Sequence, residues 1–158
     1  MTNYANIPAA TASTPCQPDL RGKILDLEVE MLKMEQLVIE PVHYFADGLY
    51  AREIFIPKGT TLTGKIHLRE HLNIVEGDIS VMTDDGIKRI TGRATIVSKP
   101  GIKRVGYAHE DTVWTTIHAC TETDAVKAED VLVVDTYEQF ALAAPQKEDE
   151  PCLLSQQQ

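Results

Sequence analysis

The sequence predicts an all-β fold, an antiparallel barrel or sandwich, within a single domain of 158 residues. Short apolar runs recur along the middle of the chain, and turn-forming Gly, Pro and Asp residues separate them. Two of these runs, Ile79–Thr83 and Ile87–Ile90, flank Asp84, Asp85 and Gly86, which is typical of a β-hairpin. Such hairpin spacing favours antiparallel strands over the strand–helix alternation of an α/β protein.

The chain begins with two segments outside the predicted sheet. Residues 1–19 are rich in Ala, Thr, Asn and Pro, which indicates a flexible arm. Residues 20–36 are predicted to form an amphipathic helix, which Asp19 can cap. Its apolar residues recur every four or three positions, and they are Leu20, Ile24, Leu27, Met31 and Met34. This seam fits a helix packed on its own barrel and a short coiled coil between protomers equally well.

The β-domain is predicted over residues 37–135, and residues 136–158 are predicted to hold a short helix and a disordered tail. The expected strands are Leu49–Ile56, Lys65–Glu76, Ile79–Thr83, Ile87–Ile90, Ala94–Ser98, Lys103–Ala108, Val113–Ala119 and the short edge strand Val131–Val134. Thr136 is the expected cap of a helix that reaches Ala144. The polar residues that follow are typical of disorder.

Composition excludes several classes of function. The formal net charge is −9, which disfavours nucleic acid and anionic membrane surfaces as partners. No apolar run is long enough to span a bilayer, and the first residues do not resemble a signal peptide. Three widely spaced cysteines, Cys16, Cys120 and Cys152, are typical of reduced thiols in a cytoplasmic protein. We therefore expect a cytoplasmic location.

One stretch carries an unusual group of polar residues. If residues 65–76 form a strand, Lys65, His67, Arg69 and His71 share one face, because side chains alternate between the two faces of a strand. Buried polar groups need partners, so a face with two histidines and two cations is not ordinary core. The pattern indicates the wall of a polar cavity.

The same stretch resembles the first motif of the cupin superfamily, which reads glycine, five residues, His-x-His, three residues, glutamate and a later glycine. Gly59 begins the motif here and Gly77 closes it. His67 matches the second histidine, whereas Lys65 stands at the first histidine and His71 at the glutamate. Only one of the family's metal-ligand positions in this motif is therefore matched.

The family's second motif, a Pro/Gly turn followed by a histidine, is similar to residues 99–104, with Arg104 at the histidine position. Together the two motifs cover about Leu49 to Ala119 and imply a small antiparallel barrel of the jelly-roll type. The runs Val97–Gly101 and Thr112–His118 also resemble small cupin-like proteins encoded by tailed bacteriophages.

A metal is one candidate occupant of the cavity. His67 and His71 could bind a divalent ion such as zinc, iron, nickel or manganese through their imidazole nitrogens. The third ligand could come from His109, from His118, or from Glu70 if a bulge turns it inward. Two nearby cations argue against this interpretation, because each would repel a dication.

A small anion accounts for the same residues better. Its predicted ligands are Lys65, His67, His71, Arg104 and Tyr107. Arginine holds carboxylate or phosphate through paired hydrogen bonds, and the acidic surface would leave this cavity as the attractive place for an anion. The alternative is that Lys65 and Arg104 form ion pairs with Glu53, Glu70 or Glu76 at the barrel rim.

The favoured function is therefore a small, non-catalytic, cupin-like binding protein. One alternative is a homo-oligomeric structural protein, for example of a virus particle, with a vestigial cavity. Another is a sugar-nucleotide isomerase or epimerase, with His67 or His71 as base and Tyr107 as acid. We also expect a homo-oligomer, most simply a dimer, because two-fold symmetry is the commonest arrangement.

Overall fold

The computed structural model describes residues 18–83 and 86–143. Within them lie the helices α1 (Pro18–Met31), α2 (Ala125–Leu132) and α3 (Tyr137–Ala143). The strands are β1 (Val42–Ala46), β2 (Leu49–Ile56), β3 (Thr61–Thr63), β4 (Ile66–His67), β5 (His71–Thr83), β6 (Gly86–Ser98), β7 (Val105–Ala119) and β8 (Val133–Val134). No described helix is both long enough and apolar enough to cross a membrane.

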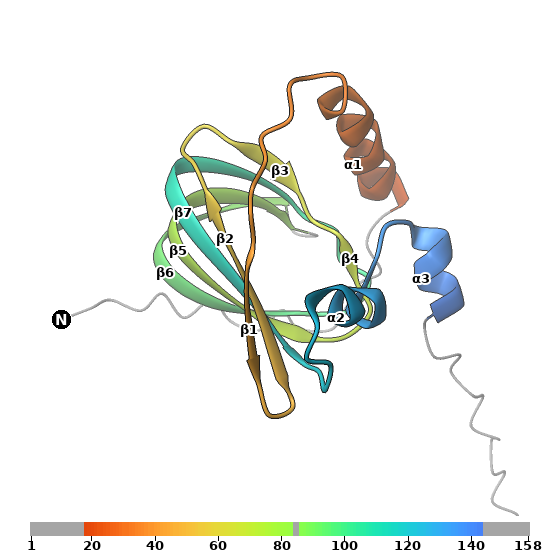
Figure 1. Ribbon diagram of the computed structural model, residues 1–158. Coiled ribbons are helices and arrows are strands. Elements are labelled where there is room, and N and C mark those ends of the chain that lie inside the picture. The colour runs from red at the N-terminus through yellow and green to blue at the C-terminus, as the bar shows by residue number, and fades with distance from the viewer. Residues whose placement is uncertain (1–17, 84–85, 144–158) are drawn as a thin grey trace, which may run out of the picture.

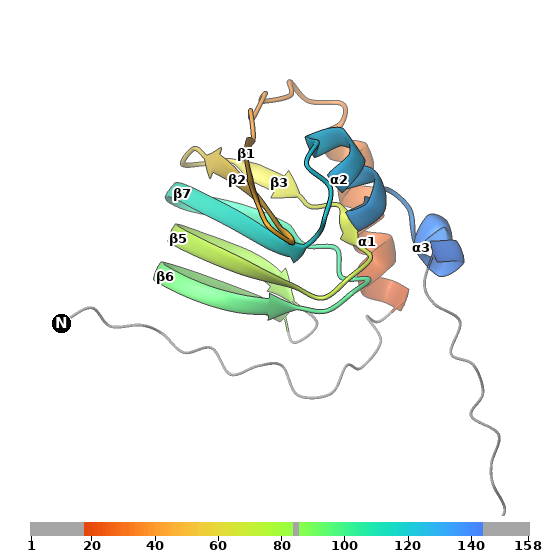
Figure 2. The same ribbon diagram turned by 60° about the horizontal axis from the view of Figure 1, so that its bottom comes forward.

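One strongly curved antiparallel sheet dominates the structure, with strand order β1-β2-β7-β5-β6 and with β3 also paired to β7. A second sheet consists of β4 and β8 alone. In Figures 1 and 2 the curved sheet lies on one side and the three helices gather on the other, beyond β3 and β4. The predicted antiparallel jelly-roll fold is confirmed.

Strand β7 is the central strand of the sheet and pairs with β2, β3 and β5. The sequence predicted two strands here, but residues 105–119 form one. β2 pairs with the second half of β7, from Thr112 to Ala119, and β3 pairs with its beginning, from Val105 to Tyr107. β5 runs along the opposite edge of both halves. His109 and its neighbours therefore lie inside a strand, because pairing with other strands on both sides of them overrides their polar composition.

A bulge bends β5 and β7 at their middle. The register between these strands shifts on both sides of Asp78. Gly77 has a φ of 148°, and a Cβ atom there would lie 2.7 Å from the carbonyl oxygen of Asp111. Only glycine allows this backbone approach without strain. The predicted strands on each side of Gly77 are consequently one long strand with a bulge.

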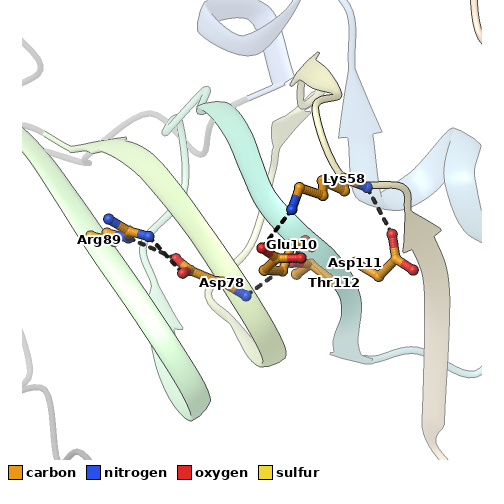
Figure 3. A network of polar contacts seen from close by, with 6 residues as sticks. All are labelled: Lys58, Asp78, Arg89, Glu110, Asp111 and Thr112. Atoms are coloured by element: carbon orange, nitrogen blue, oxygen red, sulfur yellow. Dashed lines mark hydrogen bonds and ion pairs between the residues drawn. The ribbon is translucent and has the colours of Figure 1, made fainter.

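A network of polar contacts holds the corner between β2 and β3 against this bulge (Figure 3). The amide of Lys58 donates to Asp111 Oδ1 at 2.8 Å, and its ammonium pairs with Glu110 at 2.7 Å. On the neighbouring strands, Arg89 makes two hydrogen bonds to Asp78, at 2.8 and 2.7 Å. These contacts position the corner at which the sheet curves around its interior.

The interior is apolar towards the bulge. Its central cluster comprises Ile56, Val75, Ile79, Val81, Ile90, Ala94 and Ala108, each at most 5% exposed. Ile54, Leu62, Ile96 and Trp114 pack against it. The strands alternate between this interior and solvent, as the half-buried sheet requires.

Helix α1 packs on its own barrel. Ile24 is 2% exposed, and Glu28 forms an ion pair with the buried Lys103 at 2.8 Å. The helix ends at Met31, before the predicted end at residue 36, and Met34 is 69% exposed. The helix begins at Pro18, before the predicted start at residue 20, so Asp19 lies within its first turn and is not its cap as predicted. The packing of Ile24 agrees with the first of the two interpretations of the seam, and the homo-oligomer stays a prediction.

The end of the described chain holds one helix that the sequence did not predict. Residues 125–132 form α2, and Asp124 caps it by accepting a hydrogen bond from the amide of Lys127 at 3.0 Å. The predicted strand 131–134 is therefore halved, because its first two residues belong to α2. The predicted cap of α3 is confirmed, since Thr136 Oγ1 accepts from the amide of Gln139 at 3.2 Å.

The predictions for the arm before residue 18, for Cys16 and for the tail from residue 144, with Cys152, fall outside the described residues. Cys120 is described and is a buried free thiol, as expected.

Candidate functional site

The curved sheet and the β4–β8 sheet enclose a cavity of about 370 Å³. It is lined mainly by β2, β5 and β7, by the segment from Leu62 to His67, and by α2. The polar and charged residues that line it are Tyr50, Arg52, Thr63, Lys65, His67, His71, Asn73, Arg104, Thr116, His118 and Glu129. The predicted polar cavity is thus present, and four of the predicted site residues line it.

Three histidines meet at one end of this cavity. Candidate ligand atoms of His67, His71 and His118 all lie within 4.8 Å of one another. The rings of His67 and His71 stack with centroids 4.0 Å apart, and the ring of His118 lies 5.0 and 4.6 Å from them. His71 and His118 are buried, and His67 is partly buried.

The route of the chain differs from the single strand predicted for residues 65–76. His67 ends β4, residues 68–70 leave the ladder, and His71 begins β5. The two histidines meet because the chain turns between the small sheet and the large one, and not because of strand parity. His118 joins them from the end of β7, directly opposite Tyr50 of β2.

Hydrogen bonds orient two of the three rings. Nδ1 of His71 lies 3.0 Å from the carbonyl oxygen of Arg69, so this nitrogen carries the proton and donates. Nε2 of a neutral His71 is then a free acceptor. Nδ1 of His67 and Nε2 of His118 lie 3.0 Å apart and share one proton. Nδ1 of His118 is buried without a hydrogen-bond partner in the described structure.

All three imidazoles are held neutral. Burial lowers the pKa of His67 from 6.5 to about 2, and the neighbouring His71 and His118 add to the effect. Burial also lowers the pKa of His118 to about 4. The pKa of His71 is lowered by burial, with a further contribution from Arg104, against the opposing effect of its bond to Arg69. The cluster is consequently a set of lone-pair donors and not a group of positive charges at neutral pH.

The cations of the cavity occupy two different positions. Lys65 is half exposed at the rim, 3.8 Å from Glu129 and 3.6 Å from Asp135. Arg52 points inward from β2 and approaches Glu129 at 3.4 Å. Arg104 lines the cavity, and its charge contributes to the lowered pKa of His67 and His71.

The predicted rim pairing of Lys65 therefore occurs with acids other than those predicted. Glu53 instead accepts a hydrogen bond from Thr115 at 2.8 Å on the outer side of the sheet.

A buried polar network stands beside the histidines. Asn73 is 2% exposed and donates to Ser98 at 2.7 Å. Its carbonyl oxygen accepts from Trp114 Nε1 at 2.9 Å and from Thr116 at 3.0 Å. These bonds fix the indole of Trp114 as a wall of the cavity.

Two predicted site residues lie elsewhere. His109 pairs through Nε2 with Ser80 Oγ at 2.7 Å and contacts the edge of the Tyr107 ring. Tyr107 is 44% exposed, and neither residue lines the cavity. His118, and not His109, is the third histidine of the cluster, because His109 lies at the bend in the middle of β7 and His118 lies at the end of that strand. Tyr107 is likewise not available as an acid beside His67 or His71.

Arg52 and Glu129 line the cavity but were not predicted from the sequence. Strand alternation could have indicated Arg52, because Tyr50, Ile54 and Ile56 share its inward face. Glu129 had no comparable signal, since helix α2 was not predicted.

Comparisons with known proteins give matches at the level of solved structures only. No family model matches the sequence. No curated protein matches it either. A cupin domain from Bordetella pertussis Tohama I is 15% identical, with a TM-score of 0.43 over 55% of this chain and 98% of that one. A cupin-2 domain containing protein from Shewanella frigidimarina NCIMB 400 is 13% identical, with a TM-score of 0.43 over 64% and 99% of the two chains.

A putative ethanolamine utilization protein Q from Salmonella typhimurium LT2 is 6% identical, with a TM-score of 0.45 over 54% of this chain and 72% of that one. All three neighbours are less than 25% identical to this chain. Their TM-scores are below 0.5 and carry no argument about ligand or activity. The resemblance to phage-encoded proteins stays a prediction.

Proposed function

We propose that this chain is a small cupin-like binding protein that holds a divalent transition-metal ion on His67, His71 and His118, with a small anion beside it. The observation that carries the proposal is the convergence of three imidazoles, with candidate ligand atoms within 4.8 Å of one another in one cavity. Imidazole suits zinc, iron and nickel, and three protein ligands leave a coordination position open.

The details of the cluster fit such an ion. Two nitrogen ligands of a tetrahedral zinc ion lie roughly 3.3–3.4 Å apart, as follows from bonds of about 2.0–2.1 Å. The 3.0 Å separation of His67 Nδ1 and His118 Nε2 is close to this, so the ion would replace the proton that these atoms share. The bond from His71 Nδ1 to the carbonyl of Arg69 is the usual support of a metal-binding histidine.

The third histidine changes the expected occupant of the cavity from an anion alone to a metal ion with an anion beside it. Two histidines beside two cations favoured an anion, but three neutral imidazoles attract no anion by charge. The anion-binding part is instead Arg52 and Arg104, which line the same cavity. A dication near two guanidinium groups, with Glu129 as the nearby acid, leaves an excess of positive charge that an anionic ligand would balance.

Metal binding is tested by calorimetric titration of chelator-stripped protein with zinc at pH 7, together with elemental analysis of protein purified without chelator. We expect about one zinc ion per chain. Loss of a residue that only hydrogen-bonds to a metal ligand weakens metal binding by roughly 10- to 100-fold. His118→Ala removes a proposed ligand itself and should weaken zinc binding by more than this. His109→Ala is the matched control and should bind like wild type. Equal affinities of wild type and His118→Ala would contradict the proposal, as would absence of zinc binding at micromolar concentration.

A second candidate function, self-association, is favoured by the outer face of the large sheet. A row of directly opposed residues crosses all five strands, and it consists of Tyr44, Ala51, Ile117, Leu72 and Val97. Tyr44, Leu72 and Val97 are 50%, 42% and 45% exposed. With strands about 4.8 Å apart, the row is roughly 19 Å long.

We therefore propose a homodimer through this face. Light scattering at tens of micromolar should give twice the chain mass of 17.5 kDa, and Leu72→Arg should give a monomer. Val126→Arg, at an apolar position on α2 that is 70% exposed, is the control. A monomeric wild type would refute the proposal.

A further inference from the structure

The cavity changes from polar to apolar along its length, and strand register defines the change. The first layer pairs Tyr50 with His118, beside His67 and His71. The second layer is the row Arg52, Thr116 and Asn73 on β2, β7 and β5.

The third layer of the cavity is formed by Ile54 and Trp114, which are paired on β2 and β7. Beyond it the lining includes the apolar residues Ile56, Leu62, Ile79 and Val81, the last two of which follow the bulge on β5. The layer of Arg52 is therefore followed, two residues further along β2, by the layer of Ile54 and then by the apolar part of the cavity.

The apolar end offers a ligand few hydrogen bonds. The indole N–H of Trp114 is already donated to Asn73, and so is the hydroxyl proton of Thr116. Arg52 and Lys65 both approach Glu129, at 3.4 and 3.8 Å. The carbonyl oxygen of Arg104 accepts from the amide of Gly64, and the turn before Arg104 is joined to the histidine end because the amide of Gly101 donates to the carbonyl oxygen of His67. A polar group placed among Ile56, Ile79 and Val81 would lose its hydration without compensation.

We propose that the ligand of this cavity is an amphipathic monocarboxylate, with an apolar chain or ring of a few carbon atoms. The inference rests on the proposed function and names its ligand class. The carboxylate lies at the histidine end, beside the metal and the guanidinium groups of Arg52 and Arg104, and the apolar body lies against Trp114 and the isoleucines. A cavity of about 370 Å³ is near the lower end of the pockets that hold small organic ligands, roughly 300–1,000 Å³.

The single tryptophan of the chain, Trp114, lines the cavity and reports occupancy by its fluorescence. The probes are acetate, butyrate and hexanoate, with hexanamide as the uncharged counterpart of the longest acid. Each buried methylene is worth about 0.8 kcal/mol, so the affinity should rise about fourfold per methylene from acetate to hexanoate. Hexanamide should bind at least about tenfold more weakly than hexanoate, because hydrogen bonds to a charged group are roughly twice as strong as neutral ones.

Variants separate the two ends of the cavity. Arg104→Met and Arg52→Met should each reduce the preference for hexanoate over hexanamide while zinc binding persists. Arg93→Met removes an exposed cation of β6 away from the cavity and should change neither. If a methionine variant fails to fold, Arg104→Lys keeps the charge but loses the paired hydrogen bonds, and it should show an intermediate preference.

The titrations are run on zinc-loaded and on chelator-stripped protein, so the two proposals can fail separately. Zinc binding together with equal affinities for hexanoate and hexanamide would overturn the carboxylate inference and leave the metal site intact. The same holds if acetate and hexanoate bind equally, because the apolar end would then be unused. Preference for hexanoate in stripped protein, lost in Arg104→Met, would support the carboxylate inference, and the zinc titration would then decide the metal by itself.

Discussion

Acid should destabilise the metal-free protein through its buried histidines, to an extent that the pKa shifts define. The folded-state pKa values are about 2 for His67 and about 4 for His118, against 6.5 for an exposed imidazole. Below pH 6.5 these two histidines bind protons in the unfolded chain but stay neutral in the folded chain until the pH approaches their folded-state pKa values. The stability that depends on these neutral rings is therefore fully present above about pH 6.5 and is lost as the pH falls towards the folded-state values.

The magnitude follows from the same values. Between pH 7 and pH 5 each histidine should lower the free energy of unfolding by about 2 kcal/mol, since one unit of pKa difference corresponds to about 1.4 kcal/mol. The two rings share a proton, so their effects overlap, and the pair should account for about 2–4 kcal/mol. That is a large part of the roughly 5–15 kcal/mol that stabilises a domain.

The assay is urea unfolding at pH 7, 6 and 5 with chelator present, followed by far-ultraviolet circular dichroism. His118→Gln removes one titrating ring, so its free energy of unfolding should fall less steeply between pH 6.5 and 4, by up to about 1.4 kcal/mol per pH unit. His109→Gln, remote from the cavity, should retain the wild-type slope. Parallel pH profiles for wild type and His118→Gln would refute the picture of a neutral buried cluster.

Three further predictions concern the elements that shape the cavity. Gly77→Ala should lower stability by about 1–3 kcal/mol or more in urea titrations, because its Cβ would collide with the backbone at Asp111; an unchanged midpoint would contradict the bulge geometry. Lys103→Met should cost about 1–3 kcal/mol by leaving Glu28 unpaired, and the added change Glu28→Gln should recover part of the loss in a double-mutant cycle. Asp124→Ala should lower the melting temperature through a loss of about 0.5–2 kcal/mol at the cap of α2, and a wild-type melting curve would show that the cap is dispensable.

Local rules of the sequence determined many of the elements. The predicted bounds of β2 are those observed, and Thr83 pairs with Gly86 as the predicted hairpin requires. The cap at Thr136 was also predictable. These features depend on strand alternation, turn-forming residues and capping side chains, all of which act within a few residues of the chain. The polar character of the Gly59–Gly77 stretch was visible for the same reason.

Only the tertiary structure decided which residues meet in the cavity. His118 lies 51 positions after His67. The sequence offered His109 as the third ligand, with His118 only as another candidate. The choice depends on β7 continuing through the bulge, because β3 pairs with β7 before residues 109–111, β2 pairs after them, and β5 pairs on both sides. Strand register over such separations is a property of the closed sheet and has no local signal.

The charges of the site depend on burial in the same way. From the sequence, the histidines beside Lys65 and Arg104 formed a positive pocket. In the folded protein the cavity removes the rings from water, their pKa values fall, and they become neutral, while Lys65 stays at the rim with Glu129 of a helix that was not predicted. The sequence determined which ionisable groups are present, and the depth of the cavity decided which of them carry charge, because desolvation penalises the charged form.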